Sequence, residues 1–263
     1  MKIAGFWVEE EGSGEPLLLV QGLGQSSWVS RFHRAGLATR RRTIAFDNRG
    51  TGRSTKDPPY SIEQLADDAA SLVGALGVSC AHVLGHSMGG YIAQMLALRH
   101  PDLVRSLVLV GTGAGAPTHE RVPAATLDVW LANAHEPPET FARNTMFLSF
   151  ASGWTDEHED RYEQFLAARL EYPTPRECWR AQYDVATRFV ESENAVERIA
   201  AQTLVVHGTG DRVVPFANGE ALARRIPNAR LEVFPGAGHY VMLEQPERFN
   251  EVVGSFLDSV EAP

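Results

Sequence analysis

The segment Gly85-His86-Ser87-Met88-Gly89-Gly90 restricts the fold of this chain more than any other part of the sequence. It lies between an apolar run that ends at Leu84 and a helical pattern that begins near Tyr91. A G-x-S-x-G pattern in this setting is typical of a strand, a sharp turn and a helix. The glycines allow a turn so tight that the serine takes strained backbone angles and exposes Ser87 Oγ at the carboxyl edge of a sheet. The segment therefore predicts a strand–turn–helix unit with a reactive serine at its turn.

Short apolar runs that end in glycine or turn residues recur along the chain, alternating with helical patterns. Strands buried on both faces of a parallel sheet have this composition. Residues 62–76 and 92–98 carry apolar side chains at helical spacing. The alternation predicts an α/β fold with a mostly parallel, doubly wound sheet. The predicted strands are Leu17–Val20, Thr43–Phe46, Val83–Leu84, Leu107–Val110 and Leu204–Val206.

The alternation stops after Val110 and resumes near Thr203. The residues between carry helical patterns but no convincing strand, and they hold about half of the aromatic residues of the chain. We therefore predict a core domain of residues 1–111 and 201–263, with residues 112–200 inserted after the sixth core strand as a helical cap. Aromatic enrichment favours a cap over a ligand pocket, although a helical subdomain that packs its own core would use many of the same residues. The aromatic residues considered for the pocket wall are Trp130, Phe141, Phe147, Phe150, Trp154, Trp179 and Tyr183.

A serine hydroxyl is too weak an acid to attack a substrate unaided, so it needs an imidazole base held by a carboxylate. In this kind of site the chain order is serine, acid, histidine. His239 lies in a turn-rich loop after the strand-like Leu231–Phe234, and we predict it as the base. Asp211 follows the end of the strand at Leu204–Val206, on the same sheet edge as Ser87, and we predict it as the acid; a capping aspartate is the alternative interpretation.

Acyl transfer also needs backbone N–H groups aimed at the oxyanion of the tetrahedral intermediate. Met88, the residue after the serine, is predicted to supply one of them. Leu23 is predicted to supply the other, because it lies between glycines in the loop that follows Leu17–Val20. The same loop could be a plain turn.

At these residues the chain resembles the α/β-hydrolase superfamily, in particular its small capped serine esterases, lactonases and cofactor-free haloperoxidases. The matching segments are, in order, residues 21–24 with Trp28 after them, 47–54, 85–90, 207–211 and 238–239. The resemblance implies that 47–54 is a structural turn. Gln21 stands where the family usually has histidine. The oxyanion donor is a backbone group, so we expect activity to survive that difference.

These features predict a serine hydrolase that cleaves a small carboxylic ester, lactone or thioester through an acyl-enzyme. Carbon–carbon bond hydrolysis or perhydrolysis with the same triad, and a non-catalytic ligand receptor on this fold, remain alternatives. A dehalogenase or epoxide hydrolase of this fold would carry aspartate at position 87. We expect an apolar or aromatic acyl substrate, since Lys and Arg are scarce between Arg143 and Arg176 and the two that occur there, Arg161 and Arg169, lie on helical stretches that solvent can reach.

Composition and charge argue against other classes of protein. The net charge of −9 repels nucleic acid and anionic membranes. There is no apolar stretch of signal-peptide or membrane-spanning length, and Cys80 and Cys178 are too few for a disulfide framework, so we expect a cytoplasmic protein. Residues 111–116 match a loose dinucleotide-binding pattern, but Pro117 follows and no helix opens there. The chain also has no HExxH motif, so we predict no cofactor and no metal. The oligomeric state is left open, and a homo-oligomer is possible.

Overall fold

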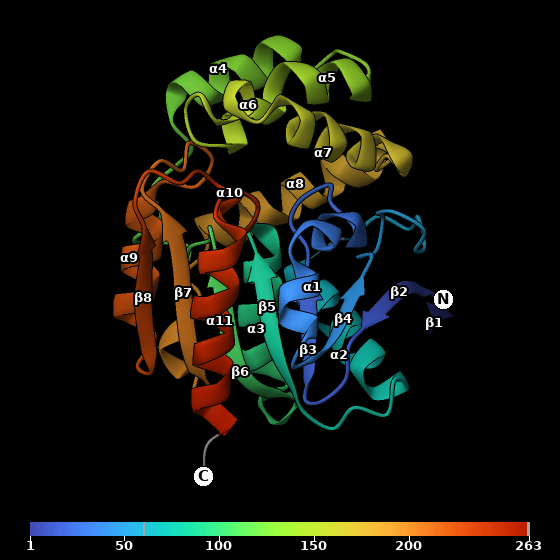
Figure 1. The fold of residues 1–263 in the computed structure, drawn as a ribbon, viewed down its shortest axis with the longest axis vertical. Helices are drawn as coiled ribbons and strands as arrows, with labels where there is room; N and C mark the ends of the chain where they lie inside the picture. The colour runs from blue at the N-terminus through green and yellow to red at the C-terminus, as the bar shows by residue number, and fades with distance from the viewer. Residues whose placement is uncertain (60, 262–263) are drawn as a thin grey trace.

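The computed structural model describes residues 1–59 and 61–261, which contain one eight-stranded sheet with the order β1-β2-β4-β3-β5-β6-β7-β8 (Figure 1). β1 and β2 are antiparallel to their neighbours, and all other neighbouring strands run parallel. Every predicted strand lies in the parallel part, so the predicted fold class is confirmed. The strands are β1 Lys2–Ile3, β2 Phe6–Glu11, β3 Pro16–Val20, β4 Arg42–Phe46, β5 Ala81–His86, β6 Val104–Val110, β7 Gln202–Gly208 and β8 Ala229–Phe234.

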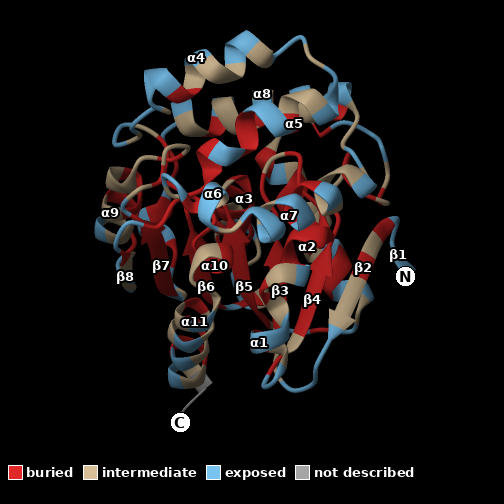
Figure 2. Ribbon diagram, turned by 45° about the horizontal axis from the view of Figure 1, so that its top comes forward, coloured by how far each residue is buried: buried red, intermediate tan, exposed pale blue. Residues whose placement is uncertain are grey.

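Helices cover both faces of the sheet (Figure 1). The short 3₁₀ helix η1 (Ser27–Phe32), α1 (Arg34–Ala38), α10 (Val241–Glu244) and α11 (Pro246–Glu261) pack on one face, and α2 (Ile62–Ala75), α3 (Met88–Arg99) and α9 (Phe216–Arg225) pack on the other. Each face has its own hydrophobic core. In β3, Leu17 and Leu19 point into the core on the α1 and α11 side, and Leu18 and Val20 point into the core on the α2 and α3 side. Because both faces are covered, most residues of the central strands are buried (Figure 2), and these strands have nearly continuous apolar runs.

In α2, the local sequence determines where the helix begins, which face is buried and where the helix ends. Ser61 precedes it in extended conformation, and its side chain accepts a hydrogen bond of 3.1 Å from Gln64 N, which caps the helix. Leu65 and Leu72 are buried on its apolar stripe against the sheet. Gly77, with a φ of +69°, lies just after its end.

Between β6 and β7 the chain forms helices beyond the carboxyl ends of the strands (Figure 1). We call residues 112–200 the helical insertion; within them the structure assigns no strand beyond one isolated bridge between Ala116 and Glu193. Tyr91 of α3 stacks on Phe189 at 4.6 Å, so the end of α8 (Arg176–Glu191) packs on the core. The helices of the insertion are α4 Ala124–Asn133, α5 Pro138–Thr145, η3 Met146–Ser149, α6 Trp154–Glu157, α7 Glu159–Glu171, α8 Arg176–Glu191 and η4 Val196–Arg198. One further short helix, η2 (Pro101–Leu103), directly precedes β6. That the helical insertion is a separate domain stays a prediction.

No helix in the described part of the chain is both long enough and apolar enough to cross a lipid bilayer.

His33, between η1 and α1, is a buried imidazole whose ring packs edge-on against Phe249 of α11 at 5.9 Å. Its Nδ1 atom is buried without a hydrogen-bond partner. Burial, with a smaller contribution from the charge of Arg34, lowers the pKa of His33 from 6.5 to about 4. The folded protein therefore holds this side chain neutral at a pH where the unfolded chain protonates it.

We expect the folded state to lose stability on mild acidification because of this histidine. A lowered histidine pKa contributes stability above the unfolded value of 6.5 and loses it as pH falls toward 4, by about 3 kcal/mol in all. Urea unfolding of the wild type and His33→Gln between pH 7.5 and 4.5 should show a smaller loss in the variant. Parallel curves for the two proteins would contradict the assignment.

Candidate active site

Ser87 lies at the turn between β5 and α3, with a φ of 56° and a ψ of −124°. A non-glycine residue with positive φ costs on the order of 1–3 kcal/mol. The turn is held by two hydrogen bonds, from Ser87 N to Val110 O at 2.9 Å and from Gly90 N to Ser87 O at 2.8 Å. A Cβ atom on Gly85 would collide with Gly89 O, and one on Gly89 would collide with Val20 O. The two glycines are therefore required by close backbone contacts, as the motif predicts.

Asp211 and His239 lie on the turns that follow β7 and β8, and both side chains are buried. His239 Nδ1 is 2.7 Å from Asp211 Oδ2. Asp211 Oδ1 accepts hydrogen bonds from the backbone N–H groups of Val213 at 2.8 Å and Val214 at 2.9 Å. The structure thus brings together the two side chains that the sequence predicts as acid and base.

The charge state of Asp211 follows from its surroundings. Burial alone would raise its pKa, but the neighbouring imidazoles of His239 and His207 outweigh burial and hold the pKa of Asp211 well below its ordinary value of 3.8. An ionised carboxylate can only accept hydrogen bonds, so His239 Nδ1 must carry the proton. In neutral His239 this leaves Nε2 as the acceptor, which is the form a general base needs.

The pair lies beside the serine turn. A Cβ atom on Gly111, the residue after β6, would lie 3.0 Å from His239 Nδ1 and 3.4 Å from Asp211 Oδ2. The preceding residue, Val110, accepts the hydrogen bond from Ser87 N. The carboxyl ends of β5, β6, β7 and β8 therefore bring Ser87, Asp211 and His239 to one edge of the sheet.

Two further buried histidines, His207 and His86, contact this group, and no role is predicted for either from the sequence. His207 Nε2 lies 2.9 Å from Val214 O and 3.3 Å from Asp211 Oδ2. His86 Nε2 lies 3.1 Å from His239 O, and the two rings are 4.6 Å apart. Burial, and then the nearby His239, lower the pKa of His86 well below its ordinary value, so this ring is neutral. The spacing of His207 and Asp211 by four residues is the only local signal for the first contact.

The loop predicted to hold the oxyanion packs directly on the serine. A Cβ atom on Gly22 would lie 3.1 Å from Ser87 Cβ, which places Leu23 next to the site. Met88 is the first residue of α3, and N–H groups in the first turn of a helix have no acceptor within the helix. Both predicted oxyanion donors are therefore at the edge where Ser87 lies.

Side chains from three other segments fix this loop. Asn48 Nδ2 donates to Gln21 O at 3.0 Å, and Gly24 N donates to the buried Gln182 Oε1 of α8 at 2.8 Å. Gln25 Nε2 donates to Tyr240 Oη at 2.5 Å. The loop is thus braced through its backbone at Gln21 and Gly24 and through the side chain of Gln25, although Gln21 replaces the usual histidine. Sequence reasoning missed Gln182, whose partner is 158 residues away.

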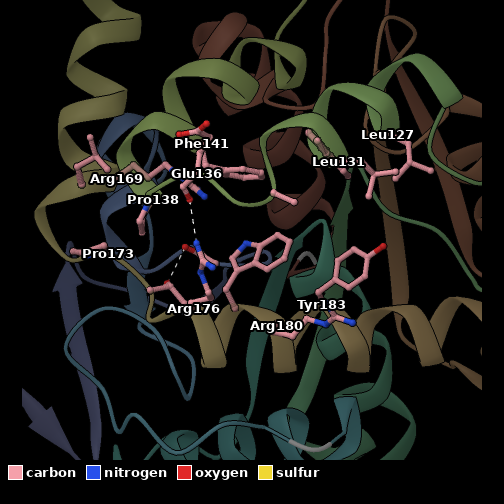
Figure 3. A pocket seen from close by; sticks show the side chains of 16 residues that line it. Leu127, Leu131, Glu136, Pro138, Phe141, Arg169, Pro173, Arg176, Arg180 and Tyr183 are labelled. Atoms are coloured by element: carbon pink, nitrogen blue, oxygen red, sulfur yellow. Dashed lines mark hydrogen bonds between the residues drawn. The ribbon is translucent and has the colours of Figure 1, made fainter.

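A pocket of about 220 Å³ opens next to this loop, between α4, α5, α7 and α8 (Figure 3). Gly24 forms part of its wall, and most of the wall is apolar. Of the seven aromatic residues considered from sequence, Trp130, Phe141, Trp179 and Tyr183 line it. Phe150 and Trp154 instead stack on each other at 4.7 Å within a buried cluster, and Phe147 is 37% exposed.

Arg169 of α7 also lines the pocket, and it is half-buried, whereas Arg161 of the same helix is exposed. Burial lowers the pKa of its guanidinium, and Nη2 would lie 3.8 Å from a Cβ atom on Gly24. No carboxylate of the described residues forms an ion pair with it. The helical spacing of α7 does not identify which of its faces meets the loop of residues 21–24. Arg169 therefore offers an unpaired positive charge beside the loop.

Within residues 1–59 and 61–261, no three His, Cys, Asp or Glu side chains lie close enough to share a metal ion. The dinucleotide-like segment 111–116 opens no helix that could bind a phosphate. The predicted absence of a metal and a cofactor stays a prediction.

Comparison with known proteins gives consistent matches. Residues 15–246 match the model of the alpha/beta hydrolase fold family. The chain is 31% identical over 273 residues to a 2-hydroxymuconate semialdehyde hydrolase from Pseudomonas sp. (strain CF600), covering 97% of this chain and 91% of that protein.

Two solved structures are similar over nearly their whole length. A thermophilic esterase from Thermogutta terrifontis superposes with a TM-score of 0.82 at 29% identity, covering 98% of this chain and 94% of the esterase. A Mycobacterium tuberculosis H37Rv protein that bears the name of a non-heme bromoperoxidase superposes with a TM-score of 0.83 at 29% identity, covering 99% and 98% of the two chains.

The strain at position 87 can be measured by comparing two substitutions. Ser87→Gly should have a higher free energy of unfolding than Ser87→Ala, by about 1 kcal/mol, because glycine adopts positive φ without a Cβ clash. Urea unfolding at neutral pH tests this. Equal stabilities, or a more stable alanine variant, would show that the backbone at Ser87 is not strained.

Proposed function

Because the chain belongs to the α/β-hydrolase family and is a hydrolase of this fold, we propose that it is a serine hydrolase that cleaves a small carboxylic ester, lactone or thioester. The observation that carries this proposal is the 2.7 Å contact between the buried Asp211 carboxylate and His239 Nδ1 at the sheet edge where Ser87 lies. An aspartate that only caps a turn would not need a histidine beside it. Here Asp211 contacts His239 Nδ1, and this leaves His239 Nε2 free to accept a proton.

In this mechanism His239 Nε2 removes the proton from Ser87 Oγ as the oxygen attacks the substrate carbonyl carbon. The ionised Asp211 stabilises the imidazolium that forms. The backbone N–H groups of Leu23 and Met88 donate to the oxyanion of the tetrahedral intermediate. His239 then gives the proton to the leaving oxygen or sulfur, and water cleaves the acyl-enzyme by the same steps in reverse.

The helical insertion acts as a lid in this proposal. Its pocket includes Gly24, one residue from the proposed oxyanion donor Leu23, and Gly22 of the same loop packs on Ser87, so we place the substrate in this pocket with its reacting bond toward the serine. Apolar walls from Trp130, Phe141 and Trp179 favour an aliphatic or aromatic group and exclude water from the reacting bond.

Arg169 favours a second candidate, hydrolysis of a carbon–carbon bond in a substrate with an anionic group. A partly buried guanidinium without a carboxylate partner is costly unless a ligand supplies the negative charge. One relative is named a 2-hydroxymuconate semialdehyde hydrolase. Both candidates use the same three side chains, and they differ in the bond that is broken.

Ser87→Ala should fold normally and lose turnover of an activated aryl ester by a factor of about 10⁴ or more, as removal of a triad member does. His239→Gln should give a similar loss. Stopped-flow hydrolysis of p-nitrophenyl esters measures both. Wild-type protein without turnover and without serine labelling by a fluorophosphonate would instead favour the ligand receptor.

Arg169→Met should raise KM for an aryl monoester of a dicarboxylic acid about 10- to 100-fold, because a hydrogen bond to a charged group is worth roughly 1.5–3 kcal/mol. KM for the neutral ester of equal chain length should change little. Arg180→Met is the matched control, since Arg180 lines the same pocket but already pairs with Asp184 at 3.0 Å. Equal effects on both esters would remove the anion site.

A further inference from the structure

One turn of the helical insertion, residues 146–151, contacts the loops that carry Asp211 and His239. We call it the 146–151 turn; it contains η3. On the acid side, Arg212 Nη2 donates to Phe147 O and to Phe150 O, both at 3.0 Å. The Arg212 guanidinium also lies over the Phe147 ring, 6.0 Å from its centroid. The residue next to the proposed acid therefore holds two carbonyls of the turn.

On the base side the turn accepts backbone hydrogen bonds. His239 N donates to Ser149 O at 2.9 Å, and Tyr240 N donates to the same oxygen at 3.2 Å. Glu244 Oε1 accepts from Ala151 N at 3.2 Å, and its Oε2 accepts from Gly238 N at 3.0 Å. The main chain on both sides of His239 is thus attached to the insertion, directly or through Glu244.

Besides the contact between Asp211 and His239, the acid and base loops bond to each other through main-chain N–H groups. Gly210 N donates to Ala237 O at 2.9 Å, and Gly236 N donates to Thr209 Oγ1 at 2.8 Å. All four of these residues precede the proposed acid or base in their own loops. Arg212, which follows the proposed acid, and residues 239–240, which include the proposed base, instead bond to the 146–151 turn.

A second contact ties the same arginine to the outer part of the insertion. Thr126 Oγ1 donates to Arg212 O at 2.8 Å. Thr126 is the one buried residue of α4, which lies at the outer rim of the molecule (Figure 2). Arg212 thus connects α4, the 146–151 turn and the acid loop.

We propose that Arg212 is a positioning residue: by holding the Phe147 and Phe150 carbonyls it fixes the 146–151 turn, and the Ser149 carbonyl then fixes His239 against Asp211. This role rests on the proposed serine hydrolase function. It makes the insertion part of the machinery of the chemical step as well as the wall of the pocket. Displacement of a catalytic group by about 1 Å can cost on the order of 100-fold in rate.

Arg212→Met should lower kcat about 10- to 100-fold while KM for a neutral aryl ester changes less than about threefold. Arg161→Met is the matched control. Arg161 Nη2 also joins the insertion to the core through a backbone carbonyl, Leu243 O at 2.7 Å, and its guanidinium also lies over an aromatic ring, that of Trp154 at 5.5 Å. It does not contact the 146–151 turn through these bonds, so its kcat should stay within about twofold of wild type.

A readout of base function separates positioning from loss of folded protein. A fluorophosphonate labels Ser87, and the rate of this labelling can be expressed per active site. In Arg212→Met this rate should fall in parallel with kcat, because labelling needs His239 but little of the pocket. Arg212→Lys should recover part of both rates, since one ammonium can reach a carbonyl but lacks the planar fork. If the methionine variant does not fold, Arg212→Gln takes its place, and its kcat should lie below that of Arg212→Lys.

Three results would overturn the role of Arg212. These are an increase in KM at unchanged kcat, equal losses in Arg212→Met and Arg161→Met, or an unchanged labelling rate per active site. They are distinct from failure of the serine hydrolase proposal, which would appear as equal activity of wild type and Ser87→Ala. Loss of activity in Ser87→Ala together with full activity in Arg212→Met would reject only the positioning role.

Discussion

The positive φ of Ser87 is the constraint on which the rest of the site depends. A residue in this conformation turns the chain from β5 into α3 within one residue and leaves its side chain at the sheet edge. The turn closes only because backbone atoms of β3 and α3 approach Gly85 and Gly89 more closely than a Cβ atom would allow. Its strain, on the order of 1–3 kcal/mol, persists because the surrounding sheet is buried on both faces.

The proposed acid depends on a different physical balance. Asp211 is buried, and a buried carboxylate without partners would take up a proton. Two backbone N–H groups contact one of its oxygens, and the imidazoles of His239 and His207 contact the other. The carboxylate stays ionised because its hydrogen-bond capacity is filled, and its fixed position determines which nitrogen of His239 carries the proton.

The sequence predicts those features that depend on local rules. The parallel strands have continuous apolar runs, and the G-x-S-x-G turn needs its glycines, so Ser87, Asp211 and His239 could be placed on one edge. The bracing residues could not, because Gln182 and Arg212 find their partners far away along the chain. β2 was missed because only alternate residues of Phe6–Glu11 are well buried and its second half is acidic. The position of Arg169 in the pocket wall could not be predicted either, because helical spacing does not identify what covers each face.

The pairing of β6 with β7 has a consequence for biosynthesis. These strands are neighbours in the sheet, yet about ninety residues of helical insertion separate them in the chain. On the ribosome, β6 is complete long before β7 is translated, so the nascent sheet ends in an apolar strand with an unpaired edge. Such an edge is a template for pairing with other chains. The long insertion therefore sets the period during which a newly made molecule is exposed to aggregation, and the demand for chaperones should be greatest while the ribosome translates it.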